Sequence, residues 1–80
     1  MAMNETQIRT LAAGVLAGIA PEADLASVGD HEDLREALDL DSMDFLNFVT
    51  GLSQRTGRAI PQADAARLFT MGGVVAYLSG

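Results

Sequence analysis

Apolar residues recur at helical spacing in three separate stretches of the chain. The first runs from Ile8 to Ile19, where apolar residues lie three or four positions apart and so share one face of a helix. Asn4 is a favoured N-cap residue, and Gln7 follows it at the distance that a capping box requires. Pro21 cannot continue a helix, so the first predicted helix ends just before it.

The second stretch begins at Asp41–Ser42, two residue types that favour helix N-termini. Leu46, Val49 and Leu52 then repeat at helical spacing. Gly57 follows the last apolar residue and is typical of the position just beyond a helix C-terminus. The pattern predicts a second main helix of about four turns.

The third stretch covers Met71–Leu78, with Thr70 as its expected N-cap. Between the second and third stretches, Ile60 lies in an extended loop that ends at a proline, and Gln62–Leu68 has the pattern of a short helix. No segment alternates apolar and polar residues long enough to predict a strand.

The pattern therefore predicts an all-α fold, a small bundle of three main helices plus one or two short ones. A long loop, residues 21–41, joins the first two main helices, and Asp30 is the expected cap of a short turn through Leu34–Leu38. A connection of this length is expected to let those two helices run roughly parallel. Gly14 and Gly18 each cost about 1 kcal/mol of helix propensity relative to Ala, so a neighbouring helix is expected to approach them closely.

Composition excludes several classes of function. The chain has 80 residues, no cysteine and a single histidine, His31. Residues 1–80 are therefore expected to form one domain, with no disulfide framework and no thiolate metal cluster. Nucleophilic catalysis by a Ser-His-Asp or Cys-His arrangement would depend entirely on His31, which lies in a charged loop, so we expect no enzyme.

Negative charge is concentrated in one part of the chain. The net charge is −6, and residues 21–44 alone carry nine carboxylates against one arginine. This balance argues against nucleic acid as a partner and favours proteins with basic docking surfaces. The carboxylates lack the spacing of a calcium-binding loop, so we expect no metal site.

The chain shows no signal for a membrane. Its longest apolar run, Leu11–Ala20, has ten residues, whereas a membrane-spanning helix needs about 18 or more. The N-terminal residues lack the positive flank and the cleavage site of a secretory signal. We expect a cytoplasmic monomer.

The most informative segment is Leu38–Asp44, which reads Leu-Asp-Leu-Asp-Ser-Met-Asp. An apolar helix of about four turns follows it, an Ile-Pro pair comes eighteen residues after Ser42, and a final helix closes the chain. This arrangement resembles the acyl carrier proteins, the phosphopantetheine-attachment family, over essentially the whole sequence. The Asp-Ser-Met triplet is a close variant of the family's Asp-Ser-Leu motif.

The resemblance implies a cofactor, an attachment residue and partners. A transferase would use magnesium to attach 4′-phosphopantetheine from coenzyme A to Ser42. Asp41, Met43, Asp44 and Phe45 would form part of the docking surface for that phosphopantetheinyl transferase and for acyl-handling enzymes. The family fold would match the helix order predicted above.

The same resemblance implies that the bundle leaves room for an acyl chain. The candidates for the apolar interior, or for a pocket within it, are Leu46, Val49, Leu52, Ile60 and Leu68. The second helix also departs from the family pattern, because Asn47 replaces a common glutamate and Ser53–Arg55 replaces an acidic run. This difference predicts a specialised carrier for polyketide-like, lipid-modifying or other secondary biosynthesis rather than for general fatty-acid synthesis.

Two alternatives remain open from the sequence. The first is a carrier of amino acids in a peptide-synthetase-type pathway. The second is a helical interaction module in which Ser42 only helps to begin a helix. Transfer of a phosphopantetheine group to Ser42 separates both carrier hypotheses from the interaction module.

Overall fold

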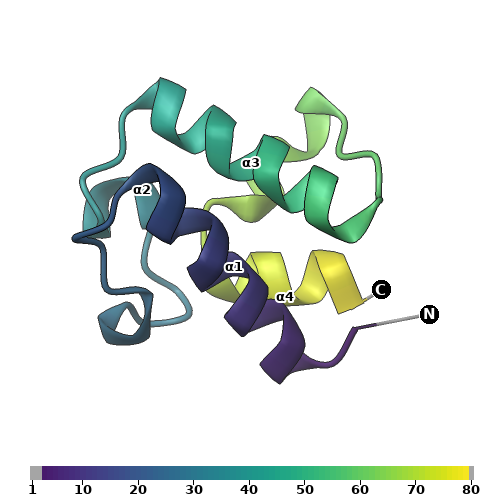
Figure 1. Ribbon diagram of the computed structural model, residues 1–80, viewed down its shortest axis with the longest axis horizontal. Helices are drawn as coiled ribbons and strands as arrows, with labels where there is room; N and C mark the ends of the chain where they lie inside the picture. Colours follow the sequence, from purple (N-terminus) through teal and green to yellow (C-terminus); the bar gives the residue numbers. More distant parts are fainter. Residues whose placement is uncertain (1–2, 80) are drawn as a thin grey trace.

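The computed structural model describes residues 3–79, which fold into helices joined by loops (Figure 1). Within this range no strand forms, and Asp33 and Thr70 make an isolated β-bridge. The predicted all-α bundle with three main helices is confirmed, and within this range it has three short helices where one or two were predicted. The elements in chain order are α1 (Glu5–Ile19), the 3₁₀ helix η1 (Leu25–Ser27), α2 (Leu34–Ala37), α3 (Ser42–Thr56), the 3₁₀ helix η2 (Gln62–Leu68) and α4 (Met71–Ser79).

The predicted helix ends follow local hydrogen bonding. The Asn4 side chain accepts the Gln7 amide N–H at 2.8 Å, and the Gln7 side chain accepts the Asn4 amide N–H at 3.0 Å, which completes the capping box of α1. Asp41 caps α3 by accepting the Asp44 amide N–H at 2.8 Å. Gly57 ends α3 with φ of 70°, a left-handed conformation that favours glycine.

Asp30 does not cap the short turn, contrary to the prediction. α2 begins at Leu34, so its N-cap is Asp33, whose side chain accepts the Arg35 amide N–H at 2.9 Å. The Asp30 carboxylate instead accepts two hydrogen bonds from Arg9 of α1, at 3.0 and 2.9 Å. The backbone carbonyl of Asp30 accepts the Gly72 amide N–H at 3.0 Å, so Asp30 ties the connection to both α1 and α4.

The predicted parallel arrangement of the first two main helices is wrong, since α1 and α3 run in opposite directions (Figure 1). Thr6 and Gln7 at the start of α1 share a shallow depression with Arg55 near the end of α3. Ala20 at the end of α1 lines a hollow with Asp39, just before α3. The connection folds upon itself through η1 and α2, so α3 begins near the end of α1 and returns along it.

The expected close approach at Gly18 is also wrong. A Cβ atom added there would meet nothing within 4 Å, whereas one added at Gly14 would lie 3.1 Å from Nη1 of Arg55. Only one of the two glycines therefore faces another helix closely. No helix of residues 3–79 has both the length and the apolar character needed to cross a membrane.

The core lies between α1, α3 and α4, and α2 and η2 close its sides. α3 turns one face inward through residues spaced at three and four positions. The buried residues of this face are Phe45, Phe48, Val49 and Leu52. The inward face fixes which residues of α3 are left on its outer surface beside Ser42.

Candidate functional site

Ser42 is the first residue of α3, and it is exposed. The carboxylate of Asp41 is occupied in capping the helix. Within residues 3–79 the Ser42 hydroxyl makes no hydrogen bond to a protein group, and no base accompanies it. The hydroxyl is therefore accessible to a modifying protein, and it needs an activating group from that protein to act as a nucleophile.

The start of α3 suits an attached phosphate. The first amide N–H groups of an α-helix have no acceptor within the helix, and the helix dipole adds positive potential there. A phosphodiester on Ser42 would lie beside these groups, the environment that helix N-termini offer to phosphate. The residues present therefore fit the phosphopantetheine group that the family resemblance implies.

The structure exchanges the expected positions of Phe45 and Leu46. Phe45 is only 7% exposed, and its ring packs on those of Phe48 and Phe69. The prediction that Phe45 belongs to a docking surface is therefore wrong. Leu46 is 50% exposed, so it does not belong to the core, although it lines a groove beside Ser42. The rotation of α3 about its axis places position 45 inward and position 46 outward.

The other predicted residues lie as follows. Met43 is 62% exposed, and Asp41 is exposed as well. Val49, Leu52 and Leu68 are buried, as predicted for the core. The remaining two residues are partly covered, namely Asp44 and Ile60.

A groove of about 790 Å³ leads away from Ser42 between α3 and η2. Met43 and Leu46 form part of its wall from α3. Ile60 and Phe69 contribute to the opposite side. Because these side chains are apolar, the groove can accept an alkyl or similar chain lying along the surface of α3.

Arg35 also lines this groove, and sequence analysis missed it. Its guanidinium donates to Asp33 through Nε at 3.1 Å and through Nη2 at 2.7 Å. These hydrogen bonds lower the pKa of the Asp33 carboxyl below its usual value and raise that of Arg35. One feature of the sequence could have identified it, because Arg35 is the single basic residue in the acidic stretch 21–44.

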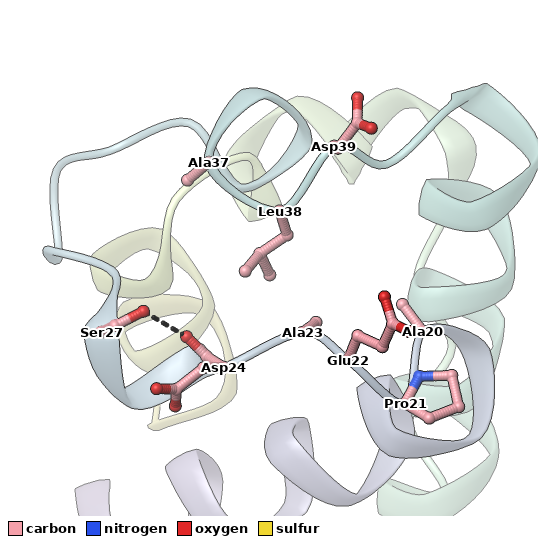
Figure 2. Close-up of a pocket in the computed structure, with 9 residues that line it drawn as sticks. All are labelled: Ala20, Pro21, Glu22, Ala23, Asp24, Ser27, Ala37, Leu38 and Asp39. Carbon is pink, nitrogen blue, oxygen red and sulfur yellow. Dashed lines mark hydrogen bonds between the residues drawn. The ribbon is translucent and has the colours of Figure 1, made fainter.

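A second hollow, of about 670 Å³, lies between the segment 20–27 and the connection from α2 to α3. Figure 2 shows Leu38 pointing into this hollow, whereas the carboxylates of Asp24 and Asp39 point away from it. Among residues 3–79 no three ligating side chains lie close enough together to hold a metal ion. His31, the single imidazole, is exposed in the same connection.

The protein is a small helical bundle with an exposed serine at the start of α3. Residues 6–78 match the family described as "Phosphopantetheine attachment site". The chain is 32% identical over 57 residues to an acyl carrier protein of Lactobacillus acidophilus, a match that covers 71% of each chain. The chain belongs to the acyl carrier protein family, and its cofactor is 4′-phosphopantetheine.

A solved structure shares the fold. The acyl carrier protein of Enterococcus faecalis, described as having high thermal stability, superposes with a TM-score of 0.76. The superposition covers 96% of both chains at 23% sequence identity. At this identity the likeness supports the helical arrangement alone.

Proposed function

We propose that Ser42 carries the 4′-phosphopantetheine arm and that the protein transports acyl intermediates of biosynthesis without an active site of its own. The observation that carries this proposal is the exposed hydroxyl at the start of α3, within the matched attachment domain. When bound, the group would supply a thiol for thioester formation, which the chain lacks because it has no cysteine.

The proposed docking surface surrounds this serine. Asp41 and Met43 are exposed and Asp44 is partly exposed, and the outward side chain of Leu46 extends the apolar part of the surface. A phosphopantetheinyl transferase and acyl-handling enzymes with basic surfaces would bind here, because opposite charges steer association. The cytoplasmic location and the monomeric state stay predictions.

The outer face of α3 supports a specialised carrier. Asn47, Thr50 and Gln54 are exposed and uncharged, and Arg55 follows them. A partner that recognises carboxylates along this helix would find them only in its first turn. We therefore propose a secondary pathway, polyketide-like or lipid-modifying, and we expect the host's fatty-acid synthase to load and elongate this carrier slowly. Normal rates of elongation would contradict this assignment.

The attachment residue can be tested by intact mass. The protein is incubated with coenzyme A, magnesium and a phosphopantetheinyl transferase, together with the variants Ser42→Ala and Ser27→Ala. Ser27 is an exposed serine in η1 and serves as the matched control. We expect a mass increase of one phosphopantetheine in the native protein and in Ser27→Ala, and none in Ser42→Ala.

The same experiment separates the alternatives. No mass increase with several transferases would favour a helical interaction module that lacks the arm. Incubating the arm-bearing protein with acyl-loading and aminoacyl-loading enzymes then distinguishes an acyl carrier from an aminoacyl carrier. The proposal predicts loading by the acyl-handling enzymes.

A further inference from the structure

Arg35 is the one charged side chain, among residues 3–79, that lines the groove leading from Ser42. The rest of the lining is apolar or uncharged, although the protein carries a net charge of −6. A group that binds in this groove therefore contacts one cation, the Arg35 guanidinium, next to apolar side chains.

The guanidinium of Arg35 is held in place from two sides. Asp33 accepts hydrogen bonds from Nε and Nη2, and the Cζ atom lies 3.7 Å from the centroid of the Phe69 ring. This distance places the guanidinium over the ring face, a cation–π arrangement. Nη1 donates to no protein group among residues 3–79, so its N–H groups are available to a ligand.

Phe69 is itself fixed, so the stacked pair does not depend on flexible surface chains. The Phe69 carbonyl accepts the Leu34 amide N–H at 2.7 Å, and Leu34 is fully buried. The Phe69 ring lies 5.2 Å from that of Phe45 in the core. Because both partners are already ordered, a ligand that bonds to Nη1 loses little additional side-chain freedom.

We infer that Arg35 selects the cargo, favouring acyl groups that carry a neutral oxygen acceptor, a keto or hydroxyl group, over unbroken alkyl chains. This inference rests on the proposed function, because it assumes cargo on an arm at Ser42. An alkyl chain lying on the guanidinium would displace water from Nη1 without replacing the hydrogen bond. A keto or hydroxyl oxygen on the chain replaces it.

The charges around Arg35 favour a neutral oxygen over a carboxylate. The Asp33 carboxylate already balances the guanidinium in a close ion pair, 2.7 Å from Nη2 to Oδ2. Asp41 and Asp44 place two further carboxylates within two residues of Ser42, which lines the groove. These carboxylates would repel a cargo that ends in a carboxylate. A neutral hydroxyl or keto oxygen is not repelled and can accept a hydrogen bond from Nη1 of Arg35.

The experiment compares cargo of equal length on the arm-bearing protein. Octanoyl and a set of hydroxyoctanoyl groups, with the hydroxyl at successive positions, are loaded from their coenzyme A thioesters by a phosphopantetheinyl transferase. NMR then follows the Arg35 Nε–H and the Phe69 ring. We expect at least one hydroxyoctanoyl group to shift both signals more than octanoyl does. Equal shifts from all the cargo groups would overturn the inference.

Two variants give the matched comparison. In Arg35→Met, the larger shift of the Phe69 ring with hydroxyoctanoyl than with octanoyl is expected to disappear. Arg67→Met removes an exposed arginine of η2 outside the groove, and there the larger shift is expected to remain. Arg35→Lys keeps the positive charge but lacks the planar guanidinium with its several N–H donors. We therefore expect a smaller difference between the shifts caused by hydroxyoctanoyl and octanoyl in this variant. Loss of the difference in Arg67→Met as well would count against a specific role for Arg35.

Intact mass separates the two possible failures. Absence of a mass increase at loading would contradict the proposed function itself. A normal mass increase followed by equal shifts for octanoyl and all hydroxyoctanoyl groups would leave Ser42 as the attachment residue and would contradict only the selection by Arg35.

Discussion

Gly51 of α3 packs directly on Val15 of α1. A Cβ atom added at Gly51 would lie 2.6 Å from Cγ1 of Val15, well inside van der Waals contact. Val15 is only 6% exposed, and its β-branched side chain has little freedom to move away within a helix. The two helices can therefore approach this closely only because α3 lacks a side chain at this position.

This contact predicts opposite outcomes for two glycine-to-alanine substitutions. Gly18→Ala adds a methyl group in open space and should stabilise the fold by up to about 1 kcal/mol through helix propensity. Gly51→Ala has the same propensity gain, but overpacking in a core costs about 1–3 kcal/mol. We expect Gly51→Ala to be the less stable variant by that margin, measured by urea unfolding.

A double-mutant cycle tests the cause. Val15→Ala should cost less in the Gly51→Ala background than in the native protein, because it removes the methyl group that the new Cβ would meet. Equal stabilisation by both glycine substitutions would contradict the close contact between the helices.

Two adjacent residues of α3 should respond very differently to truncation. Phe45→Ala removes a buried ring that packs on Phe48 and Phe69, and such changes cost about 3–5 kcal/mol. Leu46→Ala trims a half-exposed side chain and should change the free energy of unfolding by about 0.5 kcal/mol or less. Thermal unfolding followed by circular dichroism measures both. Similar costs for the two would contradict the rotation of α3 described above.

Sequence reasoning located the helix ends because their signals are local. The reciprocal hydrogen bonds of Asn4 and Gln7 involve residues three apart, and Asp41 caps α3 through the amide of Asp44. Thr70 likewise accepts the Gly73 amide N–H at 3.0 Å at the start of α4. Each contact depends on a few neighbouring residues, so their identity was enough to predict it.

The rotation and direction of the helices could not be predicted in the same way. Apolar residues occupy positions 45 and 46 of α3 side by side, and the pattern alone does not show which one faces the core. The packing of Phe45 against Phe69 of a later segment decides the matter. The direction of α3 relative to α1 depends on how the long connection folds, which involves contacts such as that of Asp30 with Arg9.

The candidate site shows the same division. Ser42 was predicted from its immediate neighbours and from the family resemblance, and the structure places it on the surface. Arg35 and Phe69 are far apart in the sequence, and they meet only because α2 packs against the segment joining η2 to α4. A local sequence pattern cannot predict a contact between residues so far apart in the chain.

The pair formed by Asp30 and Arg9 predicts a dependence of stability on pH. Two hydrogen bonds from Arg9 lower the pKa of the Asp30 carboxyl below its ordinary value in the folded protein. The folded state thus favours the ionised carboxylate, so the stabilisation is present at neutral pH. It is lost as the pH falls from about 4 through the lower folded pKa.

The test is the midpoint of thermal unfolding as a function of pH. Asp30→Asn should lower the midpoint at neutral pH and flatten its decline on the acid side, because the titrating group is gone. Arg9→Met removes this pair and also the 2.9 Å ion pair of Arg9 with Glu5, so it should lower the midpoint further. Combining the two substitutions should add little to Arg9→Met alone, because the interaction with Asp30 is already lost there. An unchanged acid decline in Asp30→Asn would contradict the role of this pair.

Asp44 gives the clearest test of electrostatic docking beside Ser42. Reversing the charge at Asp41 would also remove the N-cap of α3, at a cost of about 1 kcal/mol, whereas the Asp44 side chain makes no capping bond. We expect Asp44→Lys to lower kcat/KM for phosphopantetheine attachment several-fold, because a basic transferase surface would be repelled instead of attracted.

The matched control for this charge reversal is Glu5→Lys. Glu5 lies in the first turn of α1, at the opposite end of the bundle from the start of α3 (Figure 1). This reversal should leave the attachment rate nearly unchanged, because screening limits exposed charges to about 10 Å at 0.1 M salt. Raising the salt concentration should slow attachment to the native protein and reduce its advantage over Asp44→Lys. Equal effects of the two reversals, or a rate insensitive to salt, would show that the carboxylates beside Ser42 do not guide the transferase.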